Sequence, residues 1–204
     1  MIRSLTAEKL ACVRGDRRLF ADLDFQVSAG EVLVVEGANG VGKTSLLRLI
    51  AGFLPPAAGR VVIADGETAI SDAEERGRLV GWLGHQDGVK PQLNVVEQLE
   101  FFAHLYGARS ALDGALEQAG LLRQRLLPCR YLSAGQKKRL GLARLMVSKR
   151  PLWLLDEPLA ALDNAGRGLA AALMQAHCAS GGIVVAASHD PFDFKTRSLR
   201  LGAS

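Results

Sequence analysis

The chain has 204 residues, of which 49% are hydrophobic and 23% are charged, a balance typical of a folded domain and not of a disordered chain. This length suits one domain, or one domain with a subdomain, and excludes several independent domains within these residues. The 25 Lys and Arg residues against 21 Asp and Glu residues leave a net charge of +4, which permits phosphates, acidic head groups or nucleic acid as ligands but by itself is more typical of an ordinary solvated surface.

The amino-terminal part of the chain contains short alternating apolar segments, which predict strands at Leu10–Val13 and Leu23–Val27. The uninterrupted apolar run Val32–Val35 is typical of a buried parallel strand. The glycine-rich segment Gly37–Thr44 follows, and Ser45–Ile50 then predicts a helix. Strand, glycine loop and helix therefore succeed one another directly.

The remainder of the chain predicts strands and helices in an order typical of an α/β fold. The expected strands are Arg60–Ala64, Leu79–Leu83, Leu152–Leu155 and Ile183–Ala187, and the expected helices are Asn94–Tyr106, Ala111–Ala119 and Gln136–Val147. Asn94 suits an N-cap, with Glu97 as the acid three residues on. This order indicates a single α/β domain, residues 1–204, with a mostly parallel sheet. We expect its core at 1–85 and 147–204, with a helical subdomain inserted at about 86–146.

Compartment and membrane signals are few. Cys12, Cys129 and Cys178 lie far apart without a C-x-x-C pair, so we expect neither a disulfide framework nor a thiolate metal site, and a reducing compartment. The first nine residues lack the apolar stretch of a secretory signal, which favours the cytosol. Residues 168–188 carry no Asp, Glu, Lys or Arg, but Gly181-Gly182 within them predicts a helix, a turn and a strand instead of a transmembrane helix.

Gly37–Thr44 matches the phosphate-binding pattern G-x-x-x-x-G-K-T in full, between a strand and a helix. Glycines allow backbone N–H groups to surround phosphates, and the helix N-terminus adds partial positive charge. Lys43 can reach the β- and γ-phosphates, and Thr44 can ligate Mg²⁺. A chance glycine turn is the alternative, which the flanking strand and helix disfavour. The expected nucleotide contacts are Gly37, Ala38, Asn39, Gly40, Val41, Gly42, Lys43, Thr44 and Ser45.

The apolar strand near residue 152 ends in two acids, Asp156 and Glu157. A carboxylate in this place can hold Mg²⁺ through water, which is the role that we expect for Asp156. The adjacent Glu157 can polarise an attacking water as a general base. A solvated acidic turn before Pro158 is the alternative interpretation.

Two further polar residues suit either an anion site or a structural role. Ser133 precedes a helix whose free N–H groups can meet an anion, although by itself it is more typical of an ordinary N-cap. His189 follows a buried strand, at the sheet edge where ligands bind, although an isolated histidine is usually structural. His85, His104 and His177 have no such placement and are expected to be structural.

Taken together and in order, these residues resemble the ATP-binding subunits of ABC transporters from about Leu5 to Arg200. The matching motifs are the Walker A loop at Gly37–Thr44, the Q-loop at Gln86, the signature at Leu132–Gln136, Walker B at Leu152–Asp156, the catalytic glutamate at Glu157, the D-loop at Ala161–Asp163 and the switch histidine at His189. The resemblance implies a P-loop NTPase (RecA-like) fold with antiparallel N-terminal strands and an inserted α-helical subdomain. Ala134 stands where the family signature commonly has a glycine, and Arg14 offers a guanidinium where an aromatic residue usually stacks on adenine.

The same resemblance implies an ATPase that converts ATP and water to ADP and phosphate, with ATP and Mg²⁺ as cofactors. The implied catalytic residues are Glu157, His189 and Lys43, and the implied metal ligands are Thr44, Gln86 and Asp156, the last through water. Further nucleotide contacts are implied for Gln86, Ser133, Gly135, Asp156 and Asp163. In this family the signature of one subunit closes over the Walker A nucleotide of another, which implies a homodimer that encloses two ATP molecules.

Three strings, Asn39–Arg48, Gly84–Lys90 and Pro151–Pro158, are most similar to haem exporter ATP-binding subunits of cytochrome c maturation. This implies energy coupling for c-type cytochrome biogenesis, by haem export or by ATP-driven release of a holo-haem chaperone, which the sequence does not distinguish. It also implies a peripheral position on the cytoplasmic face of the bacterial inner membrane. The implied partners are integral permease subunits, CcmB-like with a CcmC-like subunit as a further candidate, that dock around Gln86–Gln98, with no nucleic acid and no direct haem contact. The alternative is a soluble ABC ATPase that acts on nucleic acid or ribosomes, which the basic balance permits.

Overall fold

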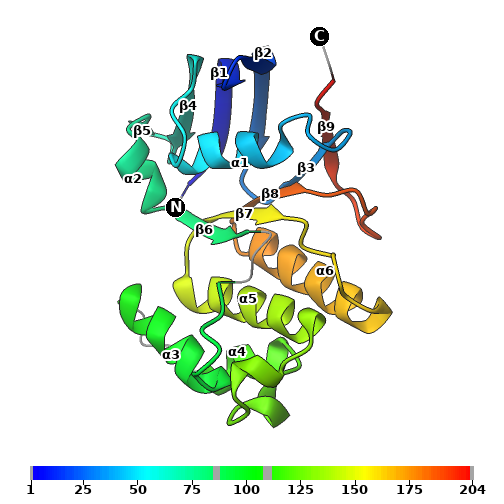
Figure 1. Ribbon diagram of the computed structural model, residues 1–204. Helices are drawn as coiled ribbons and strands as arrows, with labels where there is room; N and C mark the ends of the chain where they lie inside the picture. The colour runs from blue at the N-terminus through cyan, green and yellow to red at the C-terminus, as the bar shows by residue number, and fades with distance from the viewer. Residues whose placement is uncertain (1, 85–87, 108–111, 203–204) are drawn as a thin grey trace.

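The structure is a computed structural model that describes residues 2–84, 88–107 and 112–202. Its strands are β1 (Ser4–Arg14), β2 (Arg17–Ser28), β3 (Val32–Glu36), β4 (Ala58–Ala64), β5 (Ala69–Ile70), β6 (Val80–Leu83), β7 (Leu152–Asp156), β8 (Ile183–Ala187) and β9 (Arg197–Arg200) (Figure 1). Its helices are α1 (Lys43–Ala51), α2 (Ala73–Gly77), α3 (Val95–Leu105), α4 (Leu112–Gln118), α5 (Ala134–Ser148) and α6 (Asn164–Ala179), with short 3₁₀ helices η1 (Leu122–Gln124) and η2 (Cys129–Tyr131).

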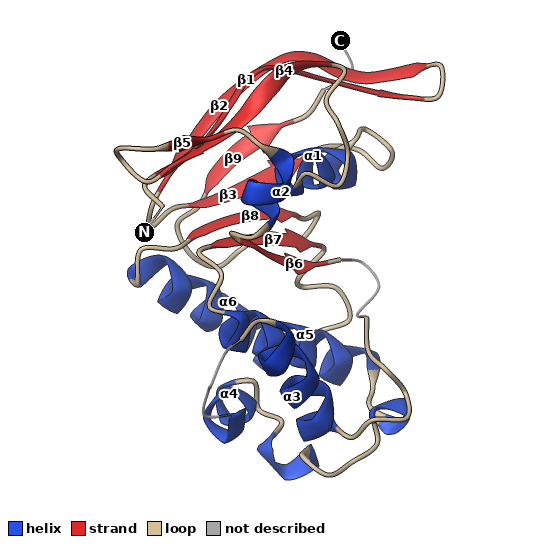
Figure 2. Cartoon of the chain, turned by 90° about the vertical axis from the view of Figure 1, so that its left-hand side faces the viewer, coloured by secondary structure: helices blue, strands red, loops and turns tan. Residues whose placement is uncertain are grey.

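Two sheets form one half of the molecule. The first has the order β2-β1-β4-β5 and is antiparallel, and the second has the order β6-β7-β8-β3-β9 with every neighbouring pair parallel. Helix α1 lies between the two sheets, whereas α5 and α6 cover the opposite face of the parallel sheet (Figure 2). The α/β class, the parallel sheet and the antiparallel N-terminal strands are therefore confirmed.

The parallel strands are buried on both faces because successive side chains point to opposite sides of a sheet. Val35 and Val185 pack in the apolar cluster that contains α1, whereas Val34 and Val184 pack in the cluster that contains α5 and α6. This double burial explains the continuous apolar runs of β3, β7 and β8. It also fixes β3 and α1, the two elements that flank the glycine loop.

A third apolar cluster joins α3, α4, η2 and α5 in the other half of the molecule. Helix α5 takes part in two clusters, with Leu142 and Leu145 against the parallel sheet and Leu140 and Ala143 against the neighbouring helices. Because α5 is buried on two sides, it connects the helical half to the sheet (Figure 1).

The observed bounds differ from the predicted ones where pairing extends an element. Strand β8 has the predicted bounds, whereas β1 and β2 are longer because they pair along a ladder that runs from Ser4 opposite Ser28 to Arg14 opposite Arg17. The N-cap predicted for α3 at Asn94 is present as a full capping box. Elements β5, α2 and β9 have no predicted counterpart, because two to five residues carry no readable periodicity.

Residues 168–188 fold as predicted into the greater part of α6, a turn and β8. Within the described ranges, no helix is both long and apolar enough to cross a bilayer. Cys12, Cys129 and Cys178 are buried and free.

Arg76 of α2 is a buried cation that binds the last turn of α1. The residue is 5% exposed, and its guanidinium donates to the carbonyls of Leu49, Ile50 and Val61 at 3.3, 3.4 and 3.2 Å, and also to that of Ser71. The last carbonyls of a helix have no partner within the helix, and a cation there complements the helix dipole. Arg76 thereby anchors the end of α1 that lies farthest from the glycine loop.

Candidate functional site

The glycine loop leaves the first turn of α1 open to a ligand. Gly42 precedes the helix with a φ of 116°, and no side chain caps the helix N-terminus. Gly37 has a φ of 144°, and a Cβ there would lie 2.6 Å from the carbonyl oxygen of Leu201, so the loop path requires glycine. An uncapped helix N-terminus that follows such a loop is suited to bind phosphate.

The Lys43 ammonium lies inside this loop. The residue is 8% exposed, and its Nζ donates to the carbonyls of Gly37 and Ala38 at 2.9 and 3.3 Å and lies 2.8 Å from His189 Nε2. Because an ammonium has only donors, Nε2 is the acceptor in this contact. The structure therefore brings together two predicted catalytic residues that lie 146 positions apart.

Thr44 and Asp156 face each other at the start of α1 and the end of β7. Thr44 Oγ1 lies 3.1 and 3.0 Å from the two carboxylate oxygens of Asp156 and donates to them. Asp156 is 5% exposed. Strands β7 and β3 flank β8 in a parallel sheet, so their carboxyl ends meet at one edge, where ligands of open α/β sheets bind.

Glu157 and His189 complete the cluster at this edge. Glu157 has a φ of 50°, a backbone conformation that costs a non-glycine residue about 1–3 kcal/mol and is typical of functional sites. Its N–H donates to the carbonyl of Ala187 at 2.9 Å. Its Oε2 accepts from the backbone N–H of His189 at 3.4 Å, and its Oε1 lies 3.7 Å from His189 Nε2. The ring of His189 thus contacts both Lys43 and Glu157.

The signature and D-loop residues occupy helix N-termini away from this cluster. Ser133 is exposed and caps α5 through a capping box. A Cβ on Gly135 would lie 2.8 Å from the carbonyl oxygen of Ala161, and Asp163 caps α6 by accepting from the N–H of Gly166 at 2.7 Å. Within the described ranges, no hydrogen bond or ion pair joins Ser133, Gly135 or Asp163 to the glycine loop.

The remaining predicted contacts are placed as follows. Asn39 and Gly40 are exposed at the tip of the loop, the N–H of Val41 donates to the Ala38 carbonyl at 3.3 Å, and Ser45 lies in the first turn of α1. Gln86 and His85 lie outside the described residues. Arg14 is exposed at the end of β1.

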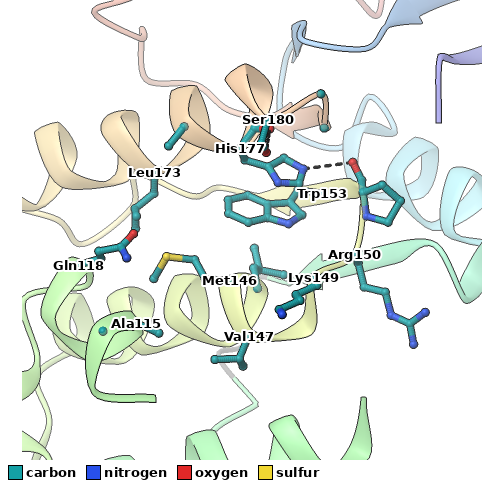
Figure 3. Close-up of a pocket in the computed structure, with 16 residues that line it drawn as sticks. Ala115, Gln118, Met146, Val147, Lys149, Arg150, Trp153, Leu173, His177 and Ser180 are labelled. Carbon is teal, nitrogen blue, oxygen red and sulfur yellow. Dashed lines mark hydrogen bonds between the residues drawn. The ribbon is translucent and has the colours of Figure 1, made fainter. Parts of the chain in front are cut away.

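Two cavities of similar volume lie on different parts of the described chain. One of about 570 Å³ opens beside His189 and is lined by Gly37, Ala38, Ser188, Asp190 and Arg200, among others. The other, of about 560 Å³, is more apolar, lies between α4, α5 and α6, and shares no lining residue with the first (Figure 3).

His177 lines the second cavity as a packed, structural histidine. Its ring stacks on Trp153 with centroids 3.9 Å apart and an interplanar angle of 10°, and its Nε2 donates to the carbonyl of Pro151 at 3.1 Å (Figure 3). Burial lowers the pKa of His177, because it disfavours the charged imidazolium.

Sequence reasoning missed Arg167. Its Nη2 lies 3.1 Å from Asp190 Oδ1, next to His189. The spacing of four residues from Asp163 places Arg167 in the first turn of α6, but nothing in the sequence pairs it with Asp190.

Comparison with known proteins agrees with this geometry. The family model described as ABC transporter matches residues 20–160. An ABC transporter ATP-binding protein from Pyrococcus furiosus superposes with a TM-score of 0.85 at 23% identity, covering 97% of both chains, a likeness that shows the fold. The fold and the site thus define an ATPase of the ABC class.

Relatives of higher sequence identity identify a narrower group within the ABC class. The cytochrome c biogenesis ATP-binding export protein CcmA of Rhodopseudomonas palustris strain HaA2 is 48% identical over 201 residues, which cover 98% of each chain. The protein of that name from Bradyrhizobium diazoefficiens is 46% identical and covers 97% of this chain and 98% of its own length. The chain therefore belongs to the ABC transporter family and, within it, to the group of CcmA proteins.

Proposed function

We propose that the chain is the ATP-hydrolysing, energy-coupling subunit of an ABC transporter for c-type cytochrome biogenesis. The names of the relatives, at 46–48% identity, supply the process. The observation that carries the chemistry is the contact of His189 with both Lys43 and Glu157, at 2.8 and 3.7 Å, beside the paired Thr44 and Asp156. These contacts bring an ammonium, a carboxylate and an imidazole together beside the glycine loop.

Each member of this cluster has a distinct role in the proposal. Lys43 exchanges its bonds to the Gly37 and Ala38 carbonyls for the β- and γ-phosphate oxygens. Glu157 accepts a proton from the attacking water, and His189 holds the water and the γ-phosphate in place. Such catalysis is mainly positioning and charge stabilisation. The nucleotide contacts in this proposal are Gly37, Ala38, Asn39, Gly40, Val41, Gly42, Lys43, Thr44, Ser45, Gln86, Ser133, Gly135, Asp156 and Asp163.

Mg²⁺ fits the pair Thr44 and Asp156. Both residues present oxygen atoms, about 3 Å apart, and Mg²⁺ prefers oxygen ligands and is held by one or two protein groups together with substrate phosphates. Thr44 would hold it directly, Asp156 through water, and Gln86 is the third ligand in the proposal. When bound, Mg²⁺ neutralises charge on the phosphates.

A second copy of the chain completes the site. Ser133 and Ala134 are exposed at the N-terminus of α5, and the chain carries one glycine loop and one signature. We therefore place Ser133 and Gly135 of each copy on the γ-phosphate bound by the other, in a homodimer with two ATP molecules.

The membrane partner docks on the helical half. In this proposal residues 1–85 and 147–204 form the nucleotide-binding core, and about 86–146 form the subdomain that carries the docking surface at 86–98. Phe101 and Leu105 of the adjoining α3 are 41% and 64% exposed, which suits contact with an integral CcmB-like permease, with a CcmC-like subunit as a further component. The chain is then peripheral on the cytoplasmic face of the inner membrane, with no contact to haem or nucleic acid. Cross-linking to the permease that maps only to residues 65–75 would contradict this docking surface.

The test of the proposed function is Glu157→Gln, which removes the base and keeps the shape of the side chain. We expect near-normal ATP affinity, an ATP-dependent dimer, and hydrolysis at least about 100-fold slower, the scale of a lost general base. Glu67→Gln, an exposed change on the turn between β4 and β5, is the matched control and keeps wild-type hydrolysis. Unchanged steady-state hydrolysis by Glu157→Gln would overturn the assignment.

Two further experiments separate the alternatives for the process. Membrane association that depends on a co-expressed permease favours the transporter, whereas salt-sensitive retention on nucleic acid favours a soluble ATPase acting on nucleic acid or ribosomes. Haem movement in vesicles that contain the purified complex, measured against release of the haem chaperone, decides between export and chaperone release.

A further inference from the structure

Arg167 connects the D-loop to the turn that carries His189. Its backbone N–H donates to the Asp163 carbonyl at 2.8 Å, and its Nε donates to the carbonyl of Leu162 at 3.4 Å. On the other side of the same guanidinium, Nη2 lies 3.1 Å from Asp190 Oδ1. One planar group thereby fixes two segments that lie more than 20 residues apart in the chain.

Asp190 in turn fixes the position of His189. The hydroxyl of Ser188 donates to the Asp190 carbonyl at 2.9 Å and accepts from the Asp190 N–H at 3.1 Å, and Ser188 is 3% exposed. His189 lies between these two residues, and its own N–H donates to the Glu157 carboxylate. A shift of Asp190 therefore moves His189 relative to Lys43 and Glu157.

The D-loop also contacts the signature. The carbonyl of Ala161 lies so close to Gly135 that a Cβ at residue 135 would approach it to 2.8 Å. Ala161 has a φ of 63°, a left-handed conformation that few non-glycine residues adopt. The N-terminus of α5 and the turn of His189 are thus connected through residues 161–163 and Arg167.

We propose that Arg167 is a positioning residue that couples the signature of one copy to the switch histidine of the same copy. The inference rests on the proposed function, in which Ser133 and Gly135 bind the nucleotide of the second copy. Closure on that nucleotide moves Ala161, and Arg167 passes the displacement to Asp190 and His189 at the chain's own nucleotide. Arginine suits this role because its planar fork can donate in two directions at once, which a lysine ammonium on a flexible stem does less well.

The test compares Arg167→Ala, Arg167→Lys and Asp190→Asn in the full chain with its membrane partner. We expect kcat to fall about tenfold in Arg167→Ala and Asp190→Asn, since small misplacements of catalytic groups have effects of this order or more, with partial recovery in Arg167→Lys. The Kd for a fluorescent ATP analogue stays within about twofold of wild type. Because the side chains of the pair are 34% and 35% exposed, the ion pair adds little stability, and the Tm moves by less than about 4 °C. The matched control is Arg60→Ala, which breaks the exposed pair with Glu8 and leaves kcat unchanged.

The double variant Arg167→Ala/Asp190→Asn decides between coupling and two separate defects. A double variant about as active as either single variant supports the proposal. Wild-type kcat in Arg167→Ala, or defects that multiply in the double variant, would overturn it while Glu157→Gln still blocks hydrolysis. If Glu157→Gln hydrolyses ATP normally, the proposed function and this inference both fall.

Discussion

Lys43 Nζ donates to His189 Nε2 at 2.8 Å, so the lysine of the glycine loop and the histidine that follows β8 contact each other directly. The same ammonium is bound by two loop carbonyls, so three protein acceptors surround it. In the proposed function, ATP binding replaces these acceptors with phosphate oxygens and releases His189 Nε2 from Lys43.

This contact predicts the tautomer of His189. In the nucleotide-free protein, ¹⁵N-detected correlation spectra of the imidazoles should show His189 protonated on Nδ1 and not on Nε2, because Nε2 accepts from Lys43. Lys43→Met removes the donor and should abolish this preference, whereas Lys90→Met, at a lysine whose ammonium lies over the Phe101 ring, should leave it intact. A proton on Nε2 in the wild-type protein would contradict the geometry.

The Thr44–Asp156 pair predicts how Mg²⁺ affects ATP affinity. Thr44→Val removes the oxygen proposed to hold Mg²⁺, with little change in volume, so we expect Mg²⁺ to strengthen ATP binding at least about tenfold less than in wild type, on the scale of ligand-shell changes. Thr44→Ser keeps the oxygen and should behave like wild type. Calorimetric titration with ATP, once in Mg²⁺ and once in EDTA, measures the ATP affinity with and without the metal. If Mg²⁺ strengthens ATP binding by Thr44→Val as much as by wild type, this metal position is excluded.

Two glycine-to-alanine changes should have opposite effects on the free energy of unfolding. Gly135→Ala brings a Cβ to 2.8 Å from the carbonyl oxygen of Ala161, so one of the two residues must shift. We expect the free energy of unfolding to fall by about 1–3 kcal/mol and ATP hydrolysis to be slower. Gly168→Ala, in α6 with nothing within 4 Å of the new Cβ, should gain about 1 kcal/mol. Urea unfolding and ATPase rates check the pair. Equal stability of the two variants would disprove the close contact.

His177 predicts a pH dependence of stability. Burial lowers its pKa from 6.5 in the folded chain, so the unfolded chain binds more protons once the pH falls to about 6.5, and the stability contribution of the neutral ring is lost as the pH falls further. His177→Gln keeps a donor for the Pro151 carbonyl and removes the titration, so its urea midpoint should fall less than that of wild type between about pH 7 and pH 5. His104→Gln, at an exposed position, serves as the control with wild-type pH dependence. The same decline in His177→Gln as in wild type would refute this role.

Much of the fold, including the strand and helix on either side of the glycine loop, could be predicted, because local patterns carry these elements. The run Val32–Val35 followed by Gly37–Thr44 specifies a strand, a loop and a helix without reference to the rest of the chain, and the continuous apolar stretch before Asp156 specifies the neighbouring strand. The structure confirms both.

The contacts across the sheet edge could not be predicted. The meeting of Lys43 with His189 and that of Arg167 with Asp190 depend on the strand order β7-β8-β3, which no local spacing encodes. The role of Ser133 stays a prediction for a related reason, since its proposed ligand lies in another copy of the chain.

The buried guanidinium of Arg76 offers a way to follow movements of α1 by spectroscopy. Because Arg76 binds the carbonyls at the end of α1, we expect helix α2 to follow a tilt of α1, the helix that begins at the glycine loop. A spectroscopic label on exposed Glu75 of α2 would therefore report movements of α1 from a residue outside the glycine loop.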